Sequence, residues 1–337
     1  MEKMSFKLEL RWNPLLREWV IVAAHRQYRP WQPKTMCPFC PGSEETKGKW
    51  DVLALPNKFP SLVESPPSPF SSPKPPYKVE KAYGICEVIV ETPDHEGDLC
   101  DLPQENVERV IDLFAERYRE LGSKSFVKYV FIFRNKGAAI GVSLHHPHSQ
   151  IYAFPFIPPK IERELTSASE YFQKHETCLF CDVLKAEKED GKRIVYESEY
   201  MVAFVPYSAM WPYEVHIYPK RHLGSLLEMN EEERSDLAWV LRVVTATYNS
   251  LFGFSLPYIM VFHQSPTDGE NYSFYHMHIE FYPPHRDKEK LKYAAGVEWG
   301  AGTFIYDKEP EYRARKLRKT CKKVLKETLR IGKSFIS

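Results

Sequence analysis

Apolar positions along this chain change period in a regular way, from the spacing of a helix to that of a strand. They recur every three or four residues from Gln104 to Leu121 and from Glu231 to Leu251, which predicts two long amphipathic helices. Asn230 stands where its side chain would cap the second helix. The segment Ile161 to His175 also has a helical pattern, and a basic helix is predicted from Lys308 to the C-terminus.

Short runs of β-branched and aromatic residues lie between these helices. Tyr129–Phe133 and Tyr258–Phe262 each follow one of the long helices and predict strands. A further strand is predicted from His146 to Phe154, whereas the proline-rich residues 65–73 predict a loop. Several short strands with one long helix in each group favour an α+β fold, in which an antiparallel sheet packs against long helices.

The chain repeats its own motifs once. Cys37-Pro38-Phe39-Cys40 is echoed by Cys178-Leu179-Phe180-Cys181, Glu87-Val88 with His95 by Glu214-Val215 with His222, and His146-Pro147-His148 by His276-Met277-His278. Self-similarity in one order along the chain indicates an internal duplication. We therefore expect two related halves, residues 1–165 and 166–337, joined by the helical segment that begins near residue 161.

Composition excludes several classes of function. The chain has 337 residues and a formal net charge of +1, which gives no electrostatic basis for nucleic-acid binding. No apolar run is long enough to span a membrane, and the N-terminus does not have the apolar stretch of a signal peptide. Seven cysteines, an odd number, favour reduced thiols. These features predict a cytoplasmic protein.

The repeated cysteines and histidines predict two zinc sites. Structural zinc takes four Cys or His ligands, and the duplication groups Cys37, Cys40, His95 and His146 in one set and Cys178, Cys181, His222 and His276 in the other. A redox role in the manner of thioredoxin is less favoured, because neither Cys-x-x-Cys pair precedes a clear helical pattern. A rival second site, for iron or zinc, would use Glu164, His263, His276 and His278.

The two halves differ in the residues that follow their His-x-His motifs. The first continues to Gln150 and the second to Glu280. Side chains two apart on a strand share a face, so His146, His148 and Gln150 would lie together. A neutral imidazole is a good nucleophile toward phosphorus, and an amide can donate a hydrogen bond to a phosphoryl oxygen that a carboxylate would repel. The first half is therefore predicted to be active and the second vestigial.

These residues carry a resemblance to a known family. The run from Asn135-Lys136-Gly137 through Gly141-Val142-Ser143 to His146-Pro147-His148-Ser149-Gln150 resembles the signature of the galactose-1-phosphate uridylyltransferases, in the histidine-triad superfamily. Further segments resemble landmarks of that family in its order along nearly the whole chain; they are residues 25–31, 37–40, 57–60, 93–95, 262–264 and 292–293. The implied architecture is two histidine-triad-like halves.

The resemblance implies a ping-pong nucleotidyl transfer from UDP-glucose to galactose 1-phosphate. His148 would carry the uridylyl group, and Gln150 would hold its non-bridging oxygens. The residues implied in substrate binding are Arg26, Arg29, Asn57, Phe59, Asn135, Gly141, Ser143, Lys292 and Glu298. Arg26, Arg29 and Lys292 would approach the phosphates, in part from the partner subunit of a homodimer, and Glu298 would face the hexose.

Two alternatives stay open at this point. Ser149 occupies a position where the family more often has Gly or Cys. A relative with the same two zinc motifs transfers an adenylyl group from ADP-glucose to phosphate. An ADP-glucose phosphorylase or a related hexose-1-phosphate nucleotidyltransferase is therefore the second candidate. A zinc-stabilised nucleotide-binding module is the third, and the difference between Gln150 and Glu280 counts against it.

Overall fold

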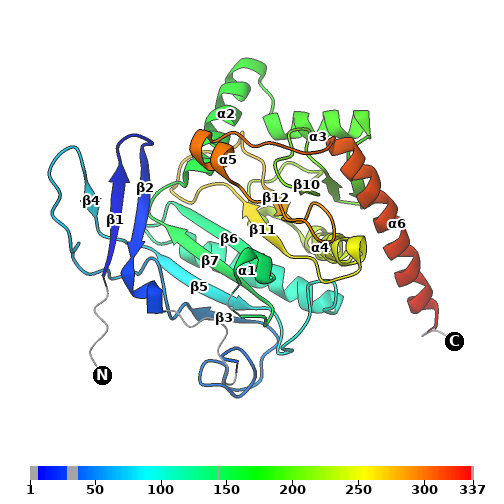
Figure 1. The fold of residues 1–337 in the computed structure, drawn as a ribbon, viewed down its shortest axis with the longest axis horizontal. Helices are drawn as coiled ribbons and strands as arrows, with labels where there is room; N and C mark the ends of the chain where they lie inside the picture. The colour runs from blue at the N-terminus through cyan, green and yellow to red at the C-terminus, as the bar shows by residue number, and fades with distance from the viewer. Residues whose placement is uncertain (1–6, 29–36, 143, 335–337) are drawn as a thin grey trace.

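The structure is a computed structural model that describes residues 7–28, 37–142 and 144–334 (Figure 1). Its centre is a nine-stranded sheet in which every neighbouring pair of strands is antiparallel. From one edge to the other the strands are β3 (Leu53–Pro56), β5 (Ile85–Val90), β7 (His148–Phe154), β6 (Tyr129–Lys136), β11 (Tyr258–His263), β12 (His278–Tyr282), β10 (Val215–Pro219), β9 (Met201–Phe204) and β8 (Ile194–Glu197).

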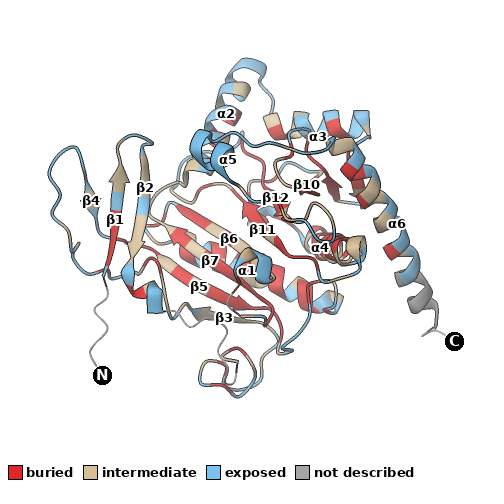
Figure 2. Cartoon of the chain, viewed as in Figure 1, coloured by how far each residue is buried: buried red, intermediate tan, exposed pale blue. Residues whose placement is uncertain are grey.

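Helices cover both faces of this sheet. On one face α1 (Gln104–Gly122) and α4 (Glu231–Phe252) bury their apolar sides against alternate strand residues such as Val130 and Ile132. On the other face α2 (Pro159–His175) and α3 (Leu179–Asp190) pack on a second cluster that includes Tyr129. The sheet strands are accordingly buried along most of their length (Figure 2). The α+β class, with an antiparallel sheet and long helices, is confirmed.

The remaining elements lie at the periphery. α6 (Pro310–Ser334) packs on α4 and β8, and α5 (Gly296–Ala301) is a short helix that precedes it (Figure 1). A separate three-stranded sheet is formed by β2 (Glu18–Ala23), β1 (Leu8–Asn13) and β4 (Val79–Glu80). Single turns of 3-10 helix complete the fold at Ala24–Tyr28, Ala138–Ile140 and Leu226–Glu228. Within the described ranges, none of the helices combines the length and apolar character that a membrane crossing requires.

The predicted helices begin and end close to the expected residues. α4 begins after Asn230, whose side chain accepts a hydrogen bond from the backbone N–H of Glu233 while the Glu233 carboxylate accepts one from the backbone N–H of Asn230. It ends at Phe252, and the next residue, Gly253, has a φ of 76°, the left-handed conformation that glycine adopts without strain. α2 and α6 confirm the other two helical predictions. The proposed boundary between residues 165 and 166 lies within α2 and stays a prediction.

The sheet places corresponding strands of the two halves on either side of the β6–β11 pair. On the face of the sheet away from α1 and α4, residues that pair across neighbouring strands form one row, in the order Val88, Gln150, Phe133, Val261, Glu280, His216. Gln150 and Glu280 therefore occupy matching positions. So do Val88 and His216, which means that the match of Glu87-Val88 with Glu214-Val215 was wrong by one residue. Glu87 pairs with Arg117 of α1, whereas Glu214 contacts His216 on the other face.

Candidate active site and metal centres

His148 is the first residue of β7, and the fold fixes the orientation of its ring. Its Nδ1–H donates to the backbone carbonyl of His146 at 2.8 Å, so in the neutral ring the lone pair lies on Nε2. The side chain is 7% exposed, and the ring of Phe39 lies 5.4 Å away from it between centroids. A buried neutral imidazole with a defined tautomer is suited to nucleophilic attack.

The strand begins two residues later than predicted. His146 was expected on the same strand face as His148, but β7 starts at His148 because Pro147 has no N–H to donate to the ladder. The Pro147 carbonyl instead accepts from the backbone N–H of Glu91, at 3.1 Å. Alternation within β7 still places His148 and Gln150 on one face, and Gln150 is 7% exposed.

A cavity of about 330 Å³ lies beside His148. It is lined by loop and strand-end residues of the first half, among them Asn135 and Val142, and by Ser255 of the second half. Gly141, with a φ of 80°, ends the short 3-10 turn next to Val142. Of the predicted binding residues, Asn135 therefore lines this cavity and Gly141 adjoins it, while Ser143 lies outside the described residues.

A second group of predicted binding residues is linked by hydrogen bonds, and one of them, Arg26, contacts Tyr152 further along β7. Arg26 donates through Nη1 to the carbonyl of Phe59 at 2.5 Å and to the hydroxyl of Tyr152 at 3.4 Å. The Asn57 side-chain oxygen accepts from the backbone N–H of Phe59 at 2.9 Å. Tyr152 shares a strand face with Gln150, so this group continues the surface that His148 begins. Arg29 lies outside the described residues.

Lys292 and Glu298 lie apart from the cavity within one chain. The Lys292 ammonium is buried, donates to the carbonyls of Met210 and Ile305, and is 3.9 Å from a Glu298 oxygen. Burial lowers the pKa of Lys292. Neither side chain is among the described residues that line the cavity beside His148.

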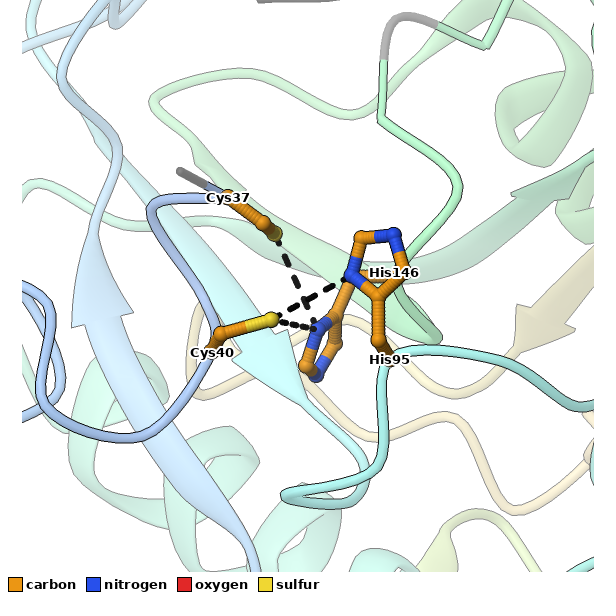
Figure 3. Close-up of side chains that lie close together, drawn as sticks. All are labelled: Cys37, Cys40, His95 and His146. Atoms are coloured by element: carbon orange, nitrogen blue, oxygen red, sulfur yellow. Dashed lines mark hydrogen bonds between the residues drawn. The ribbon is translucent and has the colours of Figure 1, made fainter. Parts of the chain in front are cut away.

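The first predicted zinc set converges at one point (Figure 3). The Sγ of Cys40 is 3.3 Å from Nδ1 of His95 and 3.7 Å from Nδ1 of His146, and the Sγ of Cys37 is 3.8 Å from the same His146 atom. The Nε2–H of His146 donates to the Thr92 carbonyl at 2.8 Å, which directs Nδ1 toward the cysteines. Burial lowers the pKa of His146, so the ring is kept neutral, as a ligand must be.

The second predicted zinc set also converges. The Sγ of Cys181 is 3.3 Å from Nδ1 of His222 and 3.4 Å from Nδ1 of His276. Hydrogen bonds, first with Cys181 and then with His222 and His276, lower the pKa of the Cys178 thiol toward the thiolate that metals bind. The expectation that no helix follows either Cys-x-x-Cys pair was wrong here, because α3 starts directly after Cys178. Two histidines at the sulfurs nevertheless fit a metal centre better than a redox pair.

A third cluster joins Glu164, His263, His278 and Glu280, with ligand atoms all within 4.8 Å of one another. The rival set with His276 was wrong, because His276 lies with the second pair of cysteines and Glu280 takes the fourth place instead. Burial alone would raise the pKa of Glu280, but the charges of His263, His216 and Lys160 hold it well below its usual range. Sequence reasoning missed Lys160, one turn before Glu164 on α2, although its i, i+4 spacing was a visible signal.

His278 repeats the ring orientation of His148. Its Nδ1–H donates to the His276 carbonyl at 3.1 Å, and the ring of Phe180 lies 5.1 Å away, as Phe39 does from His148. In both halves, therefore, the second histidine of the motif is oriented by a hydrogen bond to the carbonyl of the first histidine and by contact with a phenylalanine ring. They differ in what surrounds it, an amide at Gln150 and an ionised carboxylate at Glu280.

Comparison with known proteins gives a consistent result. The family model "Galactose-1-phosphate uridyl transferase, N-terminal domain" matches residues 2–158, and the corresponding C-terminal domain matches residues 164–328. The galactose-1-phosphate uridylyltransferase of Thermotoga maritima is 47% identical over 93% of this chain and 98% of its own length. The enzyme of Haemophilus influenzae is 37% identical over 91% of this chain and 93% of its own length.

Solved structures agree in fold. One described as a uridylyltransferase superposes with a TM-score of 0.87 at 42% identity, covering 94% of this chain and 99% of that one. An ADP-glucose phosphorylase from Arabidopsis thaliana shares the fold, with a TM-score of 0.72 at 24% identity over 92% of this chain and 98% of its own. With both halves matched by the family models and the Thermotoga relative spanned almost end to end, the chain belongs to the galactose-1-phosphate uridylyltransferase family.

Proposed function

We propose that this protein transfers the uridylyl group of UDP-glucose to galactose 1-phosphate through a covalent adduct on His148. The observation that carries the proposal is the hydrogen bond from His148 Nδ1 to the His146 carbonyl, which leaves the lone pair on Nε2 beside a cavity. Membership of the family supports the substrates, because the Thermotoga and Haemophilus relatives bear the name of this activity.

The reaction consists of two displacements at one phosphorus atom. Nε2 of His148 attacks the α-phosphorus of UDP-glucose, the bond to the bridging oxygen breaks, and glucose 1-phosphate leaves. A phosphate oxygen of galactose 1-phosphate then attacks the same phosphorus, forming UDP-galactose and restoring the imidazole. In both steps the Gln150 amide donates to a non-bridging oxygen as its negative charge grows. We assign Asn135 and Gly141 to the phosphates, and Asn57 and Phe59 to the nucleoside.

Metal ions fit the three clusters in different ways. The two Cys₂His₂ sets match the ligand preference of zinc, and zinc bound there would supply structural stability rather than chemistry. Cys37, Cys40 and His95 would then fix His146, two residues before the nucleophile. The cluster of two histidines and two carboxylates suits a divalent ion such as iron or zinc.

A homodimer accounts for Lys292 and Glu298. The segment that contains them exposes large apolar side chains, with Tyr293 71%, Trp299 82% and Ile305 57% exposed. Exposed apolar groups gathered in one segment are typical of a surface that another protein covers. Paired with a second copy, this segment would bring its substrate-binding residues to the partner's His148 cavity. Sedimentation of wild type against Trp299→Ser tests this, since a dimer is expected for the first and a weakened dimer for the second.

Turnover rates with two pairs of substrates identify the donor and the acceptor. We expect product from UDP-glucose with galactose 1-phosphate at a rate at least tenfold above that from ADP-glucose with phosphate. The second candidate, an ADP-glucose phosphorylase, would show the reverse ratio. Equal absence of both reactions in zinc-replete protein would contradict the proposed activity.

A further inference from the structure

A buried ionic network lies directly behind the His148 strand. Ser149 points to the opposite face of β7 from His148, and its hydroxyl donates to the Glu91 carboxylate at 2.6 Å. The Arg134 Nε donates to both oxygens of the same carboxylate, at 2.9 and 3.0 Å. Ser149 and Glu91 are 0% exposed and Arg134 is 2% exposed.

Glu91 and its neighbour Thr92 also form hydrogen bonds with the residues that precede His148. The Glu91 N–H donates to the Pro147 carbonyl at 3.1 Å, and the Thr92 carbonyl accepts from His146 at 2.8 Å. With Ser149 included, residues 91–92 therefore contact three of the four residues from 146 to 149. The fourth, His148, takes its ring orientation from the His146 carbonyl. A shift of Glu91 would move this segment as a unit.

The network is absent from the matching positions of the second half. By strand register, Ser149 corresponds to Ile279, which precedes Glu280, and Arg134 corresponds to Phe262, which follows Val261. Val88 matches His216 in the register. Glu91 lies three residues after Val88 and Pro219 lies three residues after His216, so Glu91 corresponds to Pro219. The fold thus accepts three apolar residues where the first half buries an ion pair and a hydroxyl.

Stability does not explain why the first half keeps these charges. Burying a carboxylate and a guanidinium costs desolvation that their attraction offsets only in part, and apolar replacements of similar volume are often as stable or more so. Ile279 and Phe262 are themselves packed in the main core. The charged version occurs in the half whose histidine is the proposed nucleophile, which points to a role in the reaction.

We propose that Glu91 is a positioning residue for His148. It holds the Pro147 carbonyl through its backbone and the Ser149 hydroxyl through its carboxylate, while Arg134 holds that carboxylate in place through two hydrogen bonds. This inference rests on the proposed role of His148. No local pattern in the sequence indicates this role, because Glu91, Arg134 and Ser149 come from three different strands or strand ends.

Ser149→Ala is the direct test, because it removes only the hydroxyl and leaves the ion pair in place. The measurement is the rate of adduct formation on mixing with UDP-glucose alone, across donor concentrations. We expect the rate at saturating donor to fall about tenfold, since small misplacement of a nucleophile is costly, while the half-saturating concentration stays within about twofold. Thr247→Val is the matched control, because it removes an equally buried hydroxyl bond, 2.7 Å to the Val243 carbonyl of α4.

Glu91→Met tests whether Ser149 acts through Glu91. Methionine is similar in length and cannot accept the hydroxyl, so adding Ser149→Ala to Glu91→Met is expected to change the rate less than about twofold. A further tenfold loss in the double variant would show that the two act separately.

The positioning role is overturned if Ser149→Ala keeps the wild-type rate, or if Thr247→Val loses as much. These two variants decide the question even if Glu91→Met does not fold. A wild-type protein that turns over without forming an adduct would instead refute the role of His148, a result visible before any variant is made.

Discussion

Gln150→Glu would give the first half the residue that the second half has at the matching position. The change is nearly isosteric, so packing is preserved and only the hydrogen-bonding and charge of one side chain differ. Glu280 stays ionised because Lys160, His216 and His263 surround it. The row neighbours of Gln150 are Val88 and Phe133, which offer no positive charge.

Two effects set the size of the loss. Removing one donor to a developing oxyanion costs about 3–4 kcal/mol, or roughly 10²–10³ in rate. A carboxylate about 4 Å from a phosphoryl oxygen adds repulsion of about 4 kcal/mol at an effective dielectric constant of about 20. Solvent screening and protonation of the new carboxyl reduce the second effect. We therefore expect kcat to fall by at least about 10³ at pH 8.

Gln150→Met separates the two effects, because it removes the donor and adds no charge. Its kcat is expected to fall about 10²–10³-fold at every pH. The kcat of Gln150→Glu relative to that of the wild type should rise as the pH falls from 8 to 6, because a protonated carboxyl can donate a hydrogen bond again. The assay is steady-state formation of glucose 1-phosphate from UDP-glucose and galactose 1-phosphate. A Gln150→Glu rate within tenfold of wild type at pH 8 would refute the reasoning.

Three further changes have defined outcomes. Cys37→Ser should lower the free energy of unfolding by several kcal/mol and the bound zinc by about one equivalent, and unchanged melting and metal content would exclude residues 37–40 as ligands. Asp98→Asn leaves Arg134 and Lys136 without their shared partner, so we expect a loss of about 3–5 kcal/mol at pH 7. Burial alone would raise the pKa of Asp98, but the charges of Arg134 and Lys136 lower it below its usual value. The ionised Asp98 therefore contributes its full stabilisation above about pH 4, and this stabilisation is lost as the pH falls through the lowered pKa of the folded state. The stability gap between wild type and Asp98→Asn should therefore shrink below about pH 4 in denaturant titrations, and a gap that widens there would contradict the assignment. Asn230→Ala should cost about 1 kcal/mol by the same measurement, and no loss would show that the cap of α4 contributes nothing.

Local signals in the sequence were sufficient for α1, α2, α4 and α6, but not for α3 or α5, and the repeated motifs were sufficient for the first two metal clusters. The apolar spacing of α4 and its Asn230 cap are both encoded within a few residues, so its first residue was predicted correctly and its last was missed by one. The Cys₂His₂ sets could be grouped because the duplication supplied the same pattern twice. The helix signal is therefore local, whereas the metal ligands were grouped by comparing two distant segments of the chain.

Long-range register was beyond the same reasoning. The displaced match of Glu87 with Glu214 arose because sequence spacing does not show which strand face a residue occupies. The fourth member of the third cluster was misassigned for a related reason, since His276 precedes β12 and turns toward Cys181, while Glu280 lies in the strand beside His263. The small sheet of β1, β2 and β4 was not predicted; β1 and β2 are neighbours along the chain, whereas β4 comes from a distant segment.

The central claim is that Nε2 of His148 carries the nucleotide between the two half-reactions. The most direct test is the intact mass of the protein after incubation with UDP-glucose and no acceptor. We predict a mass increase equal to one uridylyl group per chain, reversed by galactose 1-phosphate and absent from His148→Ala. An unchanged mass in a sample that converts both substrates would contradict the account.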